Sequence, residues 1–191
     1  VAGSGRMSAA RRVVLVTGAS GGIGRAVAHA YAGPNTTLVL HGRDPSALEA
    51  VGSECAAAGA RVVIWQQDIA ETTAVRDWLA RFSSHTPFDI AIVNAAMGSF
   101  VTTAAGEPWH DIDAVVRTNL LGAMATVDGV LPAMRARGHG QIALVSSLAA
   151  WHGVATMPAY CASKAGLKAY AESLRGWLAK EGIHINLVLP G

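Results

Sequence analysis

Short β-branched runs alternate along this chain with longer alanine-rich segments, and this alternation constrains the fold more than any other feature. The runs are continuously apolar, which predicts strands with both faces buried. Helical segments between such strands predict parallel pairing, because each helix returns the chain to the edge where the next strand begins. The six runs are residues 13–17, 36–42, 60–65, 89–94, 141–147 and 183–191. The expected fold class is α/β, a doubly wound parallel sheet with helices on both faces.

Composition favours one domain with a full core. The 191 residues are 51% hydrophobic and only 15% charged, too apolar for a disordered chain and long enough to enclose a core. The stretch VAGSGR before Met7 resembles the remnant of an expression tag, so residues 1–10 are predicted to be a tag-derived or disordered tail. Residues 11–191 are then predicted to form a single domain.

Charge and hydropathy argue against several classes of partner. The net charge is +2 without a cluster of Lys and Arg, so no nucleic acid is expected. No apolar run approaches the ~20 residues of a membrane span, and the N-terminus has no signal-peptide core, which predicts no membrane contact and a cytoplasmic location. Cys55 and Cys161 lack metal-ligand spacing and are predicted to be reduced thiols.

A glycine-rich turn joins the first predicted strand to the first helical segment. The sequence GASGGIG follows VVLVT directly and precedes RAVAHAYA. Glycines here let the backbone approach a diphosphate, and the helix N-terminus directs N–H groups toward its negative charge. Gly18, Gly22 and Gly24 are the candidates. The alternative is a tight turn that needs glycine for steric reasons alone.

Tyr160 and Lys164 are four residues apart in the run YCASK, so a helix places them on one face. A free phenol ionises only near pH ~10, and a neighbouring ammonium favours its phenolate form. The pair is therefore a candidate for proton transfer. Taken alone, the same spacing also suits an ordinary amphipathic helix.

Together, the motifs TGASGGIG and YCASK resemble those of the short-chain dehydrogenase/reductase family, classical type. Ser147 lies thirteen residues before Tyr160, where the family has its catalytic serine. Asn119 in TNLLGA matches the family's catalytic asparagine, and Lys164 completes its tetrad. The resemblance covers residues 11–191 and implies a Rossmann-like NAD(P)-binding fold.

One segment departs from the family pattern. The sequence VNAA keeps Asn94 and Ala95 of the family's NNAG element but has Val93 and Ala96 in place of its first Asn and its Gly. The Pro-Gly pair at residues 190–191 does match the family's turn after the sixth strand.

This resemblance implies an oxidoreductase that transfers hydride between a nicotinamide cofactor and a ketone or aldehyde, or the corresponding secondary alcohol. Tyr160 would act as the acid/base, and Ser147 would orient the carbonyl oxygen. Lys164 would support the phenolate and hold the nicotinamide ribose, while Asn119 would position a water for proton relay. No metal is required.

The cofactor preference rests on the end of the second predicted strand. Family members that use NAD place Asp or Glu there, whereas this chain has Gly42 followed by Arg43, which suits the 2′-phosphate of NADP. NADP(H) is favoured, and NAD(H) stays open if Arg43 is only a solvated loop residue. The implied cofactor-binding residues are Gly18, Ser20, Gly22, Ile23, Gly24, Arg43, Asp68, Ile69, Asn94, Ala95, Ala96, Tyr160, Lys164, Pro190 and Gly191.

Substrate and partners are less constrained. The family's 3-oxoacyl reductases often carry Gln and Asn just before the tyrosine, whereas this chain has MPAY, which favours a different ketone or aldehyde. A 3-oxoacyl-(acyl-carrier-protein or CoA) reductase is the alternative enzyme, and a non-catalytic NADP-sensing regulator or a scaffold is the alternative of another class. The family suggests a homodimer or homotetramer. Loop residues that predict an apolar pocket wall are Met97, Phe100, Trp109, Trp151, His152 and Met157.

Family members continue beyond the sixth strand with a substrate lid and a seventh strand, whereas this sequence stops at Gly191. We therefore expect the C-terminal part of the domain to be missing here and to hold much of the substrate specificity.

Overall fold

The computed structural model describes residues 11–101 and 106–191, so the predicted tail at residues 1–10 lies outside the described residues. The described strands form one parallel sheet, which confirms the predicted fold class. The strands are β1 (Arg12–Thr17), β2 (Thr36–Gly42), β3 (Arg61–Gln66), β4 (Ile90–Val93), β5 (Gly140–Val145) and β6 (Ile183–Val188).

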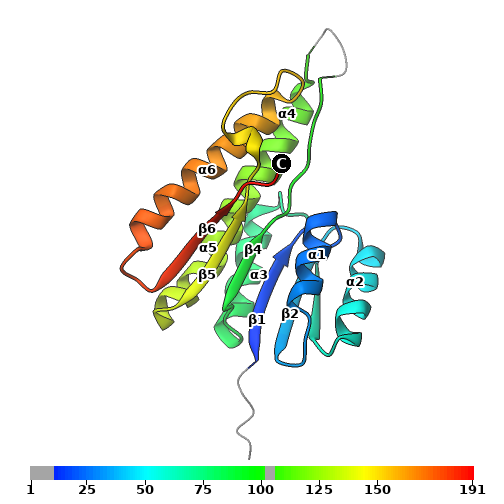
Figure 1. Ribbon diagram of the computed structural model, residues 1–191, viewed down its shortest axis with the longest axis vertical. Helices are drawn as coiled ribbons and strands as arrows, with labels where there is room; N and C mark the ends of the chain where they lie inside the picture. Colours follow the sequence, from blue (N-terminus) through cyan, green and yellow to red (C-terminus); the bar gives the residue numbers. More distant parts are fainter. Residues whose placement is uncertain (1–10, 102–105) are drawn as a thin grey trace, which may run out of the picture.

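The strand order is β3-β2-β1-β4-β5-β6, so the chain winds outward from the centre first in one direction and then in the other. The order reverses at the pair β1–β4. The strand arrowheads and the C-terminus lie at the same edge of the sheet, below α4 in Figure 1. A crevice at such a reversal is the usual ligand site of a doubly wound sheet.

Helices cover the two faces unequally. Helices α1 and α2 pack on one face, and α3, α5 and α6 pack on the other. The helices are α1 (Gly22–Tyr31), α2 (Pro45–Ala57), α3 (Thr72–His85), α4 (Trp109–Val116), α5 (Gly122–Arg137) and α6 (Pro158–Leu178), with a π turn at Arg117–Leu121 and a 3-10 turn at Leu148–Ala150.

The central strands are buried on both faces, as their apolar runs predict. In β1, Val13 and Leu15 belong to the core beneath α3, α5 and α6, whereas Val14 and Val16 belong to the core beneath α1 and α2. Alternate side chains of one strand therefore serve opposite cores.

The two edge strands correct this prediction, because they are not buried on both faces. Ile64 of β3 is 37% exposed and Val188 of β6 is 43% exposed. Alternate residues of β6, including His184 and Asn186, are also exposed. Within the described chain, neither α1 nor α2 reaches β6, so the outer face of this strand has no helical cover.

A continuous helical run extends from α4 through the π turn to α5, Trp109–Arg137. By length and composition it could cross a membrane, contrary to the expectation that no run is long enough. However, 56% of the most apolar 18-residue stretch of this run is buried inside the protein. A Cβ added at Gly129 would lie 2.7 Å from Leu79 Cβ, so α5 packs very closely on α3. The apolar character of this run is that of a core helix.

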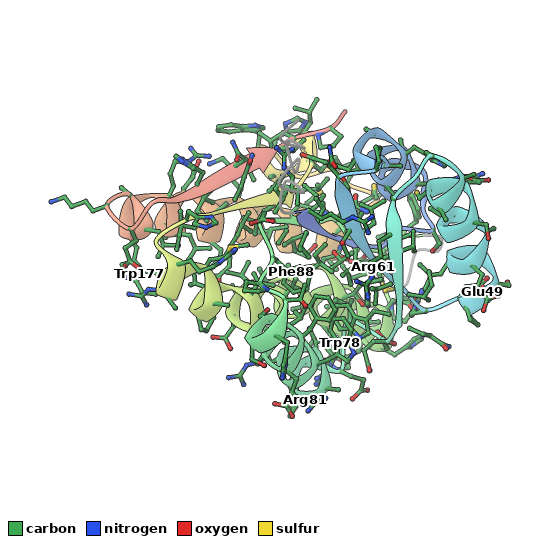
Figure 2. The ribbon with its side chains drawn as sticks, turned by 90° about the horizontal axis from the view of Figure 1, so that it is seen from below. Glu49, Arg61, Trp78, Arg81, Phe88 and Trp177 are labelled. Carbon is green, nitrogen blue, oxygen red and sulfur yellow. The ribbon has the colours of Figure 1, made fainter. Side chains whose placement is uncertain are left out.

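An aromatic stack fills the space between α3 and the sheet. Trp65, Trp78, Phe82 and Phe88 stack in series with ring centroids 4.3–5.0 Å apart. Figure 2 shows Trp78 and Phe88 on the α3 side of the sheet. The ring of His41 lies 4.5 Å from that of Trp65. The stack therefore connects the core under α3 to the carboxyl end of β2.

Candidate functional site

A cleft of about 520 Å³ lies at the carboxyl ends of β1, β2 and β4, where the strand order reverses. Most of the predicted cofactor-binding residues between positions 18 and 96 line it, and Gly24 lies directly beneath it. The lining residues are Gly18, Ser20, Gly21, Gly22, Ile23, His41, Gly42, Arg43, Asp68, Ile69, Asn94, Ala95, Ala96, Met97 and Thr118.

The glycine turn forms the floor of the cleft. Gly18 has a φ of +66°, a conformation that other L-residues rarely adopt. A Cβ added at Gly24 would lie 2.1 Å from the carbonyl oxygen of Gly18, so the turn and the first helical turn could not pack with any larger residue there. Steric need therefore explains Gly18 and Gly24. Gly22 instead faces open space, with nothing within 4 Å of an added Cβ.

Thr17 and Asn94 fasten β1 to β4 beneath the turn. Thr17 Oγ1 accepts hydrogen bonds from the N–H groups of Asn94 (2.9 Å) and Ala95 (3.0 Å). Asn94 Nδ2 donates to the carbonyl oxygens of Thr17 (3.0 Å) and Gly18 (3.3 Å). Asn94, a predicted cofactor contact, thus uses its amide hydrogens to hold the turn. Thr17 opens the TGASGGIG motif but is not among the predicted cofactor-binding residues, although a fully buried threonine that ends an apolar strand is a signal for such a role.

His41 is a second residue that is missing from the predicted set, and it lies outside both motifs. It is 2% exposed, accepts a long hydrogen bond from the Gly18 N–H at Nδ1 (3.4 Å), and places Nε2 3.1 Å from the Gln67 carbonyl oxygen. These partners require a neutral ring with its proton on Nε2, because the carbonyl can only accept. Burial lowers the pKa of His41 from 6.5 to about 4, which keeps the ring neutral near pH 7.

We expect His41→Asn to remove a pH-dependent part of the stability. The pKa of about 4 in the folded chain lies below the unfolded value of 6.5, so the unfolded chain binds the extra proton between these values. Native stability should therefore fall as the pH drops from 6.5 to 4, by about 3 kcal/mol from this group. Urea denaturation across that range should show a shallower loss for H41N than for the parent chain. A slope unchanged in H41N would contradict this, and the exposed His184→Asn is the matched control.

A second cavity, of about 190 Å³, adjoins the first at the ends of β5 and β6. Three of the four predicted catalytic residues meet there with the predicted Pro-Gly turn, whereas Asn119 is not among its lining residues. The lining residues are Ile23, Asn94, Ala96, Val145, Ser146, Ser147, Tyr160, Lys164, Pro190 and Gly191.

Lys164 is held beside the Tyr160 ring by the sheet. Lys164 Nζ donates to the carbonyl oxygen of Val145 (2.9 Å) and lies 5.7 Å from the centroid of the Tyr160 ring. The side chain is nearly inaccessible, and burial lowers the pKa of Lys164 from 10.5 to about 8. Near neutral pH the ammonium therefore keeps its charge, close to the phenol.

The two serines after β5 have different contacts. Ser146 Oγ donates to the carbonyl oxygen of Lys164 (2.8 Å) and so ties α6 to the sheet. Ser147 Oγ accepts from the N–H of Ala149 (3.1 Å) and caps the 3-10 turn. Among the described residues, none accepts the Ser147 hydroxyl proton, which is thus available to a molecule in the cavity. The thirteen-residue spacing picks out the serine with the spare proton.

Asn119 lies in the π turn and is buried. Its Nδ2 donates to the Met97 carbonyl oxygen (2.8 Å) and to Ser163 Oγ (3.1 Å), and its Oδ1 accepts from the Met97 N–H (2.8 Å). Ser163 Oγ in turn donates to the Tyr160 carbonyl oxygen (2.7 Å). Both amide hydrogens are thus engaged in joining the segment after β4 to α6. Because these bonds occupy the side-chain amide, a water held by Asn119 would have to bind the backbone of the π turn. The water-positioning role stays a prediction.

The six residues that suggest an apolar pocket wall do not line one cavity together, although Phe100 and Met157 both lie within 4 Å of a Cβ added at Gly98. Met97 lines the first cleft, whereas Trp151 and His152 line a separate apolar groove along α6. Phe100 and Trp109 are 59% and 76% exposed. Loop residues lack the periodicity that fixes side-chain direction in helices and strands, so the sequence alone does not show where they point.

Comparison with known proteins agrees with this arrangement. The family model described as short chain dehydrogenase matches residues 12–191. An oxidoreductase of Myxococcus xanthus, described as uncharacterized, is 36% identical over 181 residues, which are 94% of this chain and 71% of that protein. The ketoacyl reductase HetN of Nostoc is 34% identical, and the match covers 94% of this chain but only 63% of HetN.

A similar fold is found in a solved structure with a bound cofactor. The crystal structure of a metagenomic short-chain oxidoreductase in complex with NADP superposes with a TM-score of 0.89 and 32% sequence identity. The alignment covers 96% of this chain and 84% of that one.

Proposed function

The chain belongs to the short chain dehydrogenase family of oxidoreductases, and on that premise we propose that it transfers hydride between NADP(H) and a ketone or aldehyde, or the corresponding secondary alcohol. The observation that carries the proposal is the cavity that joins Ser147, Tyr160 and Lys164 to the cleft above the glycine turn. The cleft suits a dinucleotide, because Gly22 leaves open space where the helix N-terminus presents its N–H groups. When bound, the reduced nicotinamide supplies the hydride.

The residues of the chain supply the proton and the electrostatic support. Tyr160 donates its phenolic proton to the carbonyl oxygen as negative charge develops there, and it accepts a proton in the reverse direction. Ser147 donates its spare hydroxyl proton to the same oxygen. The Lys164 ammonium stabilises the phenolate that remains on Tyr160. Asn119 acts at a distance, since its amide fixes the backbone of Met97, which lines the first cleft.

Arg43 supports the preference for NADP over NAD. It lies at the cleft directly after Gly42, and among the described residues no ion pair or side-chain hydrogen bond engages its guanidinium. Asp44 is not available to a ribose hydroxyl in the same way, because its Oδ1 accepts from the N–H groups of Ser46 and Ala47 as the cap of α2. A free guanidinium at this place suits a phosphate monoester. A structural relative binds NADP, which is consistent with this proposal.

We expect Arg43→Ala to weaken the binding of NADPH more than the binding of NADH. A charge-assisted hydrogen bond contributes about 1.5–3 kcal/mol, so the KM for NADPH should rise about 10–100-fold while that for NADH changes little. Steady-state kinetics with each cofactor measures the ratio. Arg61→Ala is the control with the same charge change, because Arg61 lies at the amino end of β3, away from the cleft. Equal losses for both cofactors would refute a role at the 2′-phosphate.

The decisive experiment follows the absorbance of NADPH and of NADH in separate assays with a panel of ketones, aldehydes and 3-oxoacyl thioesters. Oxidation of NADPH with one substrate class supports the proposal. Turnover of 3-oxoacyl thioesters alone would favour the ketoacyl reductase alternative, which the similarity to HetN keeps open. Tight NADPH binding without turnover would favour the sensing alternative. The cytoplasmic location, the absence of a membrane or nucleic-acid partner and assembly as a homodimer or homotetramer stay predictions.

A further inference from the structure

The helix that carries Tyr160 begins without a local cap. Its N-cap residue is Met157, whose side chain makes no capping hydrogen bond, and Pro158 occupies the first helical position. The first turn of a helix has N–H groups without intrahelical acceptors, and most helices satisfy some of them with Ser, Thr, Asp or Asn. Tyr160 lies within this first turn. The position of its phenol therefore depends on what else holds the turn.

Glu107 supplies the missing cap from a distant part of the chain. Its Oε2 accepts a hydrogen bond from the Ala159 N–H at 2.9 Å, although the two residues are 52 positions apart. Ala159 directly precedes Tyr160 and is 6% exposed, so the bond forms at the buried side of the helix start. A carboxylate at this end also interacts favourably with the helix dipole.

The other oxygen of Glu107 binds the loop that follows β4. Ser99 Oγ donates to Glu107 Oε1, and Ser99 is 8% exposed. A second link joins the same loop to the segment before α6, because the Val101 N–H donates to the Thr156 carbonyl oxygen at 2.8 Å. Glu107 thus stands between two segments that approach the cavity from β4 and from β5.

From these contacts we propose that Glu107 is a positioning residue that fixes the first turn of α6, and thereby the Tyr160 phenol, against the loop after β4. The inference rests on the proposed function in that it assigns catalysis to Tyr160. Glu107 does not line the cavity of Tyr160 and acts through Ala159. Glu107 lies outside the glycine turn and the YCASK motif. Those motifs therefore do not show that the position of Tyr160 depends on Glu107.

Two substitutions separate the geometry of Glu107 from its charge. Glu107→Gln keeps an oxygen for the Ala159 N–H and an amide that can donate to Ser99, so it should retain kcat within about 3-fold. Glu107→Ala removes both contacts and should lower kcat by about 10-fold or more. The affinity for NADPH should stay within about 2-fold in both variants, because the cleft over the glycine turn is not touched. Glu172→Ala, an exposed glutamate of α6 paired with Lys168, is the matched control.

Two readouts distinguish positioning from general destabilisation. The primary deuterium isotope effect with deuterated NADPH should increase in E107A as the hydride step becomes slower, and Gln should rescue it. Amide hydrogen exchange should rise at the first turn of α6 in E107A but not at β1 or β2. Unchanged kcat together with unchanged exchange at Ala159 and Tyr160 would overturn the inference.

The outcome for Glu107 can be told apart from that for the proposed function. If the parent chain proves to be inactive on every substrate, the proposed reaction fails, yet the exchange measurement still decides whether Glu107 holds the helix start. If the parent chain is active and E107A matches it in kcat and in isotope effect, the positioning role fails while the proposed reaction stands. A loss in E107A that Gln does not rescue would also refute the role proposed here, because it would require the negative charge rather than the two hydrogen bonds.

Discussion

Tyr160→Phe should lower kcat for carbonyl reduction by ~10³-fold while NADPH still binds. General acid catalysis typically contributes 10²–10⁴-fold, and phenylalanine keeps the ring but removes the proton that the carbonyl oxygen needs. The ring carbons and the contact with Lys164 stay, so the fold should not change. Single-turnover measurement of NADPH oxidation, with an independent fluorescence titration of NADPH, separates the chemical step from binding.

Tyr170→Phe is the control for this substitution. Tyr170 belongs to the same helix but packs against the core under α3, α5 and α6 rather than lining the cavity. The Tyr170→Phe variant loses the same kind of hydroxyl group, but away from the cavity. Its kcat should therefore stay within about 2-fold of the parent value. Parent-like turnover in Y160F would rule out Tyr160 as the acid and remove the basis of the proposed mechanism.

Lys164→Met should lower kcat by about 10²-fold or more and at the same time increase stability near neutral pH. Activity falls because the phenolate loses its neighbouring positive charge. Stability rises because burial penalises the ammonium, and the shift of the Lys164 pKa from 10.5 to about 8 corresponds to about 3 kcal/mol. The lost hydrogen bond to Val145 offsets about 1 kcal/mol of this gain.

The pH dependence tests the same substitution with a defined sign. Between pH 8 and 10.5 the unfolded parent chain holds a proton on Lys164 that the folded chain has released, so parent stability rises with pH in this window. The advantage of K164M should shrink over the same interval. Urea denaturation at several pH values gives both slopes, with Lys168→Met as the control in the same helix. A difference in stability between K164M and the parent that stays constant with pH would show that burial does not shift the pKa of this lysine.

The regular parts of the fold could be predicted from sequence because they repeat a local pattern. Six apolar runs gave six parallel strands, and the spacing of Ser147 and Tyr160 brought both side chains to one cavity. A strand or helix converts sequence distance into spatial direction, so motifs on such elements can be interpreted without coordinates. The exposure of β3 and β6 was missed, because a run of apolar letters does not reveal which strands will be at the edge.

The contacts that join distant segments could not be predicted in this way. Glu107 caps a helix 52 residues later, and His41 bonds to residues of two different loops. Neither residue belongs to a motif, and each lies near its partners only after the sheet has formed. Asn119 was found through the family pattern, but its engagement with Met97 follows from the loop path after β4, which has no periodicity to predict it.

The π turn at Arg117–Leu121 has a consequence for how this domain can vary. A π turn holds one residue more than the α-helical path, and one residue corresponds to a rotation of about 100° around the helix axis. The helix before it packs on α6, whereas the helix after it packs on α3. The π turn takes up this extra residue, so both halves of the helix stay in phase with their partners. Deleting one residue here would restore the α-helical path with both halves still facing their partners, whereas the same deletion within α4 or α5 would turn one half by about 100°. This long helix can therefore tolerate a change of length at the π turn but not within either half.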